Sequence, residues 1–168
     1  MNEQRLKKSL FAFLVGLNIL VVLCVFLPIF TSSHAIQSEN SLLSFNVIEL
    51  VKRIIDGKIT DYQVITFVAI LGIILLTALI MLSFCLNRFN NKFTLRRNCL
   101  FASLILLILS IVFLVFAEVI AMQPNFTTLM GETTSSTYMV GLFPYILIVC
   151  SILIFIICLI IRKKNFKD

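Results

Sequence analysis

Few side chains in this sequence can do acid–base or metal chemistry. The chain has 168 residues, of which 8 are acidic and one is histidine. A catalytic centre would have to be assembled from Glu49, Asp56, Glu118 and His34. Nothing in their spacing brings these groups together, and there is no metal-ligand spacing, phosphate-binding loop or nucleophile elbow. We therefore predict no catalytic residue, no cofactor and no metal site.

One amide and one carboxylate lie inside the long apolar stretches, where a polar group is costly. Asn18 is near the middle of the first stretch, and we expect it to bond between packed helices, with a substrate contact as the alternative. Glu118 lies about 28 Å along a helix from Cys99, close to the predicted outer surface. There it can reach water or pair with Lys52 or Arg53, and proton coupling is the alternative.

Four apolar stretches must position these side chains. They cover residues 10–30, 64–86, 99–122 and 139–161. A helix of such length spans about 30 Å, the thickness of the hydrocarbon core of a bilayer. With 60% hydrophobic residues and a mean hydropathy of +1.09, the chain lies far outside the range of soluble domains. We predict an all-α membrane protein, with one transmembrane domain over residues 1–168 that is a four-transmembrane-helix bundle.

The basic residues are sorted by side. Most of the 14 precede the first stretch, separate the second from the third, or follow the fourth. The exceptions are Lys52, Arg53 and Lys58. The positive-inside rule then places both termini in the cytoplasm of a multi-pass plasma-membrane protein. The net charge of +6 thus reflects topology and contact with the lipid bilayer, and we predict no nucleic-acid binding.

Three short patterns admit processing or modification. Residues 33–35 resemble a signal-peptidase site, but the apolar run before them is longer than usual, so we expect the first span to be retained. The sequon at Asn125 occurs often by chance, and glycosylation there stays an alternative. At the predicted cytoplasmic end, Cys85, Cys99 and Cys158 are interpreted as packing residues, with acylation as the alternative.

The segment between the first two spans contains an amphipathic helix, at about residues 46–56. One face of its helical wheel holds Val47, Leu50, Val51 and Ile54, with Ile48 and Ile55 at the edge. Asn46 and Glu49 resemble a capping box, and Gly57 is placed to end the helix. We expect this extracytoplasmic helix to rest in the headgroup region or roof the bundle; the alternative is that it docks another membrane protein. With Glu118, the apolar face is the candidate outer contact surface.

Small residues on the first span indicate close packing. Ala12 and Gly16 are four residues apart, the spacing at which two small side chains share a helix face. Together with Asn18 they are the candidate helix-packing residues. We expect one side of the first span to lie close against a neighbour.

The plan of the chain resembles that of small four-span proteins of bacterial plasma membranes. The residues that carry the resemblance are the short basic start, Leu27-Pro28-x-Phe30 and Phe45-x-x-x-Glu49-Leu50. With its larger outer loop first, the order of elements is also similar to the claudin-like plan. The chain departs from that plan because its first outer loop has neither a tryptophan nor a pair of cysteines. The resemblance concerns architecture and implies no function.

These observations favour a non-enzymatic integral membrane interaction protein. It would be an accessory subunit of a membrane complex or an immunity-type protective protein. Its partners would be the lipid bilayer and either another membrane protein or a second copy of itself. The alternative is a small oligomeric transporter or channel for an ion or small solute, with Asn18 and Glu118 facing a shared path.

Overall fold

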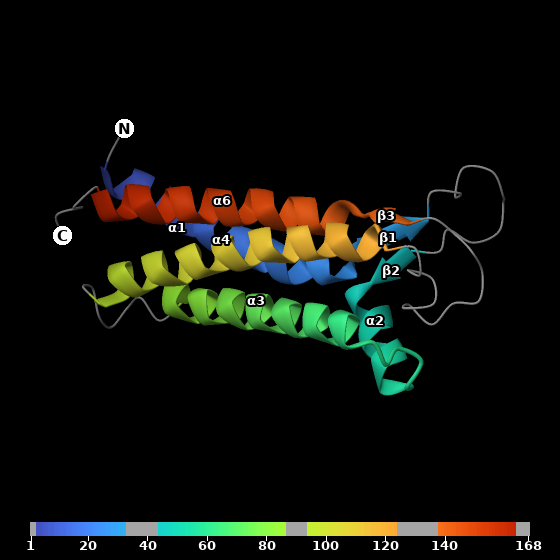
Figure 1. Ribbon diagram of the computed structural model, residues 1–168. Helices are drawn as coiled ribbons and strands as arrows, with labels where there is room; N and C mark the ends of the chain where they lie inside the picture. The colour runs from blue at the N-terminus through green and yellow to red at the C-terminus, as the bar shows by residue number, and fades with distance from the viewer. Residues whose placement is uncertain (1–2, 33–43, 87–93, 124–137, 164–168) are drawn as a thin grey trace.

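The computed structural model describes residues 3–32, 44–86, 94–123 and 138–163. Within them the chain is mostly helical, and the long helices run side by side (Figure 1). These helices are α1 (Glu3–Leu23), α3 (Tyr62–Leu86), α4 (Thr94–Ala121) and α6 (Leu142–Lys163). Among these described residues, four helical segments are long and apolar enough to cross a membrane, which agrees with the predicted number.

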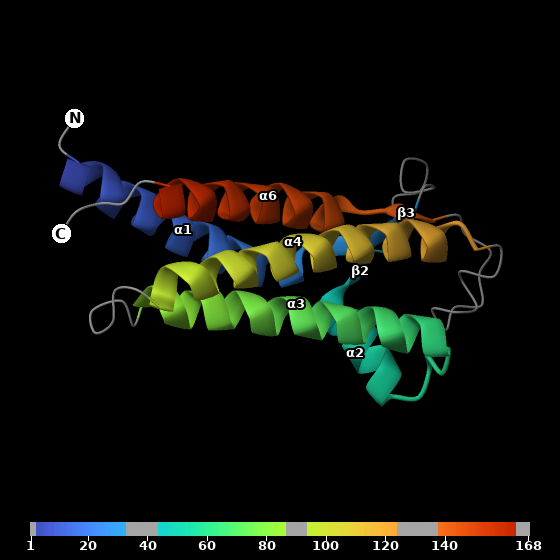
Figure 2. The same cartoon turned by 60° about the vertical axis from the view of Figure 1, so that its left-hand side comes forward.

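The long helices form one bundle with a sheet at one end. The principal contacts link α1 to α3 and α6, and link α4 to the same two helices. The start of α1 and the end of α6 lie at the end far from the sheet, as both views show (Figures 1 and 2). We call the two ends of the bundle the sheet end and the terminal end.

The small sheet was not predicted from the sequence. It consists of β1 (Pro28–Ser32), β2 (Ser44–Asn46) and β3 (Tyr138–Val140), in the antiparallel order β2-β1-β3. Residues 28–30 and 139–140 fall within the predicted spans but form strands. Helix α1 instead passes into a short 3-10 turn, η1 (Cys24–Phe26), and Leu27 is extended with φ −80° and ψ 152°. An extended residue before Pro28 is the expected geometry, because the proline ring disfavours the helical conformation there.

The sheet closes against the start of α6. Phe30 of β1 pairs with Phe45 of β2 on one side and with Val140 of β3 on the other. The amide N–H of Gly141 donates a 2.6 Å hydrogen bond to the Ile29 carbonyl oxygen. A Cβ at Gly141 would lie 2.9 Å from the carbonyl carbon of Pro28, closer than such atoms approach. The link between β3 and α6 therefore depends on a residue without a side chain.

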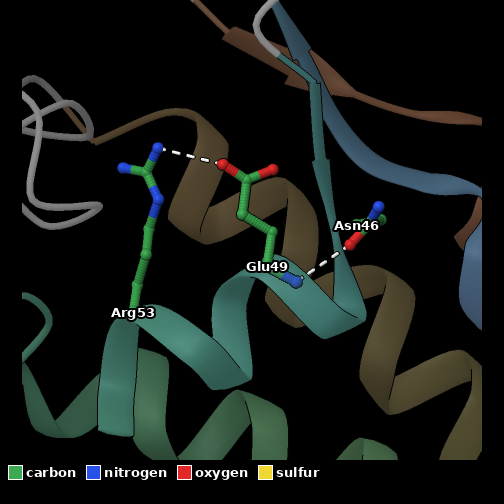
Figure 3. A network of polar contacts seen from close by, with 3 residues as sticks. All are labelled: Asn46, Glu49 and Arg53. Atoms are coloured by element: carbon green, nitrogen blue, oxygen red, sulfur yellow. Dashed lines mark hydrogen bonds and ion pairs between the residues drawn. The ribbon is translucent and has the colours of Figure 1, made fainter. Parts of the chain in front are cut away.

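The short amphipathic helix forms where the sequence places it, as α2 (Val47–Ile55). The Asn46 Oδ1 atom accepts a 2.9 Å hydrogen bond from the Glu49 amide, which confirms the predicted N-cap (Figure 3). At the other end, Gly57 has φ 71°, and the Lys58 amide donates to the Arg53 carbonyl at 2.9 Å. This is a Schellman ending, which confirms the predicted role of Gly57.

A column of phenylalanine rings fills the core toward the sheet end. Phe30, Phe67, Phe113 and Phe143 come from β1, α3, α4 and α6, and all four are fully buried. The rings of Phe67 and Phe113 are stacked with their centroids 4.4 Å apart. The centroid of Phe30 lies 5.8 Å from that of Phe67, and the edge-on Phe143 ring lies 5.6 Å from Phe113. Aromatic packing therefore joins the sheet to three spans.

Candidate functional site

The candidate packing residues of α1 lie on different sides of the helix. Asn18 is fully buried in the bundle, whereas Ala12 and Gly16 are exposed. Two positions along a helix correspond to about 200° of rotation, which places Asn18 opposite Gly16. A Cβ added at Gly16 would meet nothing within 4 Å. The structure therefore separates an inward amide from an outward small-residue face.

The outward face of α1 continues beyond the small pair. Ile19 is 44% exposed and Leu23 is 54% exposed. With Ala12 and Gly16, these residues follow the 4-3-4 spacing of a single stripe along a helix. We call Ala12, Gly16, Ile19 and Leu23 the α1 stripe. Ile19 and Leu23 were not among the predicted site residues, although their spacing from Gly16 in the sequence indicates that they lie on the same face of the helix.

Asn18 bonds to its own helix. Its Nδ2 atom donates a 2.8 Å hydrogen bond to the Leu14 carbonyl oxygen, four residues earlier. The buried Oδ1 atom has no hydrogen-bond partner among the described residues. The bond expected between helices is thus not formed, because the amide points along α1 instead of across to a neighbouring helix. This arrangement leaves one polar atom unsatisfied in an apolar core.

Asn18→Thr is expected to raise the free energy of unfolding by about 1 kcal/mol, because it removes the unpartnered carbonyl. A threonine hydroxyl can donate to the Leu14 carbonyl, as the Ser110 hydroxyl donates to Leu106 at 2.7 Å. Thermal unfolding in detergent micelles measures the change. A fall in stability of similar size would show that Oδ1 has a partner in the folded protein.

Glu118 lies near the sheet end of α4 and is half-buried. Its Oε1 atom accepts a 2.7 Å hydrogen bond from the hydroxyl of Tyr145 on α6. Arg53, one of the two predicted partners of Glu118, has its guanidinium paired with Glu49 at 3.1 Å. Glu118 thus links two helices at the surface, while Asn18 lies inside the bundle.

The apolar face of α2 is divided between the core and the surface. Val47 and Leu50 are buried, and Ile54 is partly buried against the same core. Val51 is 37% exposed, and the two residues at the edge of the wheel are more open, Ile48 at 50% and Ile55 at 78%. We call Ile48, Val51 and Ile55 the α2 edge. One half of the apolar face of α2 therefore packs against the core, and the α2 edge remains exposed.

The remaining polar candidates do not gather in one place. Glu49 pairs with Arg53, and Asp56 is exposed at the end of α2. His34, residues 33–35 and the Asn125 sequon lie outside the described residues. Among the residues described, no group of three histidine, cysteine or acidic side chains is placed to hold a metal ion.

The cysteines at the terminal end point into the bundle. Cys85, Cys99 and Cys158 are all buried. An acyl chain on any of these thiols would have to displace core side chains. Their positions therefore fit the packing interpretation.

The predicted site residues that remain exposed thus lie on the α1 stripe and the α2 edge. Both are apolar and exposed, and they lie on different elements. No family model matches this chain, and neither a curated protein nor a solved structure matches it.

Proposed function

We propose that this protein is a non-enzymatic interaction protein of the plasma membrane, with both termini in the cytoplasm. It acts as an accessory subunit of a membrane complex or as an immunity-type protective protein. A helix of the partner packs on the α1 stripe. The observation that carries this proposal is the exposed small pair on one face of α1, Ala12 and Gly16, where a Cβ at Gly16 would meet nothing within 4 Å.

The physics of helix association in lipid supports this assignment. Lipid tails are as apolar as leucine, so helices associate through close packing that small residues permit. Helices α3 and α6 pack on other sides of α1, and Ala12 and Gly16 remain exposed. Contact with lipid alone would be served by any apolar side chain. A small pair that continues into Ile19 and Leu23 suits the backbone and side chains of a second helix.

The packed interior of the bundle favours a role in binding another protein over transport of a solute through a single copy of this bundle. The phenylalanine column occupies the core between the spans. The buried hydroxyls bond to carbonyls of their own helices, Ser103 to Leu100 at 2.8 Å and Ser151 to Ile148 at 2.9 Å. Hydroxyls bonded in this way satisfy themselves locally and offer little to a passing solute.

The proposed orientation puts the sheet end outside the cell. Arg162 and Lys163 lie in the last turn of α6, at the terminal end. The starts of α1 and α4, which include Lys7, Lys8, Arg96 and Arg97, lie at the same end (Figure 1). The positive-inside rule therefore supports a cytoplasmic terminal end, and the bilayer is the first partner of the long helices.

Gly16→Leu should reduce recovery of a co-purifying membrane partner about tenfold, which corresponds to about 1.4 kcal/mol of binding free energy. Leucine at this position fills the open space and holds the partner helix away. The tagged protein is extracted in mild detergent, and the co-purifying proteins are quantified by mass spectrometry. Ala12→Leu should act in the same direction.

Gly72→Leu is the matched control, because Gly72 is also exposed in a spanning helix and a Cβ there would meet nothing within 4 Å. This variant should retain the partner. Unchanged recovery in both α1 variants would contradict the proposed contact. Recovery of a homo-oligomer without another protein would instead favour the transporter alternative.

A further inference from the structure

The α2 edge is an apolar line on a helix that already buries another part of its surface. Ile48, Val51 and Ile55 are three and four residues apart, so their side chains follow one side of the helix. Ile55 is 78% exposed, the highest value among these three. The neighbouring Asp56 and Lys52 are also exposed and have opposite charges. The line is therefore apolar, and its charged border has no net charge.

The polar contacts of α2 fix the direction in which this edge points. Glu49 and Arg53 project from α2 on the side where the strands lie (Figure 3). The Arg53 guanidinium lies over the Phe45 ring of β2, 4.5 Å from its centroid. Val51 and Ile55 each come two positions after one of these polar residues, which is about 200° round the helix. The α2 edge therefore faces away from the sheet.

The position of α2 places this edge at the level where a spanning helix begins. Helix α2 contacts α3 and lies across the direction of the long helices (Figures 1 and 2). At the start of α3, Tyr62 is 80% exposed and Ile65 is 39% exposed. An exposed tyrosine followed by exposed aliphatic residues is typical of the boundary between headgroups and hydrocarbon. The α2 edge therefore faces away from the sheet at the level where α3 begins.

We infer that the α2 edge inserts into the lipid leaflet at the sheet end, at the boundary between headgroups and acyl chains. Two isoleucines and a valine suit hydrocarbon, whereas strong protein contacts are enriched in tryptophan, tyrosine and arginine. The balanced charge beside the edge gives no attraction to anionic lipid, so the binding is hydrophobic. Helix α2 then braces the sheet on the membrane surface. This inference rests on the proposed membrane insertion and is independent of the partner on the α1 stripe.

The chain has no tryptophan, so each introduced tryptophan reports alone. Ile55→Trp is reconstituted into phosphatidylcholine vesicles whose acyl chains carry bromine near the headgroup end. Its emission should fall about twofold relative to vesicles without bromine, because the indole lies among the acyl chains. Asp56→Trp, one residue further and 100° round the helix, should lose little emission. Ile73→Trp, at an exposed position within α3, reports whether the bundle is inserted.

The outcomes distinguish insertion of the α2 edge into lipid from membrane insertion of the bundle as a whole. Quenching of Ile55→Trp with little quenching of Asp56→Trp supports insertion of the edge. Ile73→Trp can be quenched by lipid brominated deep in the acyl chain while Ile55→Trp is not quenched by lipid brominated near the headgroup. In that case the edge faces water or protein, and the inference is wrong. Equal quenching of Ile55→Trp and Asp56→Trp would also overturn it. If none of the three is quenched, membrane insertion and the proposed function fail together.

Discussion

Phe113→Ala is expected to lower the free energy of unfolding by about 3–5 kcal/mol. The Phe113 ring is fully buried between Phe67, on which it stacks, and Phe143, which it meets edge-on. Alanine removes both contacts and leaves a cavity at the point where three spans meet. In a bilayer the loss of stability comes from lost packing contacts, because lipid cannot fill the cavity inside the bundle.

The thermal unfolding midpoint in detergent micelles, followed by circular dichroism, measures this effect. Phe101→Ala is the control in the same helix, because Phe101 is 59% exposed and its loss should change stability by less than about 0.5 kcal/mol. Phe113→Leu retains most of the buried volume and should cost less than about 1.5 kcal/mol. Equal shifts for Phe101→Ala and Phe113→Ala would show that the ring column is not the core of the folded protein.

Gly141→Ala is the second substitution with a large expected effect, a loss of about 1–3 kcal/mol. The added Cβ would lie 2.9 Å from the Pro28 carbonyl carbon, an atom of the backbone that cannot rotate away. Relief of this clash requires β1 to separate from the start of α6. The 2.6 Å hydrogen bond from the Gly141 amide to Ile29 would then lengthen or break.

The same unfolding measurement tests Gly141→Ala against a substitution with the opposite expected sign. Gly72→Ala lies within α3 and meets nothing within 4 Å, so the better helix propensity of alanine should raise stability by up to about 1 kcal/mol. A stable Gly141→Ala variant would show that β1 and α6 do not approach as closely as described. A loss in both variants would point to a general intolerance of the bundle to alanine.

The parts of this protein that the sequence alone predicts are those decided by local physics. The four spans follow from length and composition, since only a long apolar helix satisfies its backbone within hydrocarbon. Helix α2 follows from the period of its apolar residues and from its ending signals, Asn46 and Gly57. The start of α3 has a similarly local contact, in which the Asp61 Oδ1 atom accepts a 2.7 Å hydrogen bond from the Gln63 amide. Each of these contacts joins residues a few positions apart.

The sheet, by contrast, depends on residues that are distant in the sequence. Strand β3 has three residues, too few to show an alternating pattern, and Phe30 pairs with Val140 across most of the chain. Both strand segments are apolar and continue the composition of the neighbouring spans. The need for Gly141 is equally invisible in the sequence, because it arises from the backbone of β1.

Tertiary structure also decides which side of each span faces inward. The spans are apolar on nearly every side, so periodicity does not identify the buried face. The inward turn of Asn18, the outward turn of Gly16 and the contact of Glu118 with Tyr145 all follow from how the helices rotate when they pack. Sequence composition thus predicts which segments form spans, because partition into lipid depends on each segment alone. The surfaces that remain for a partner are decided only when the helices cover one another's faces.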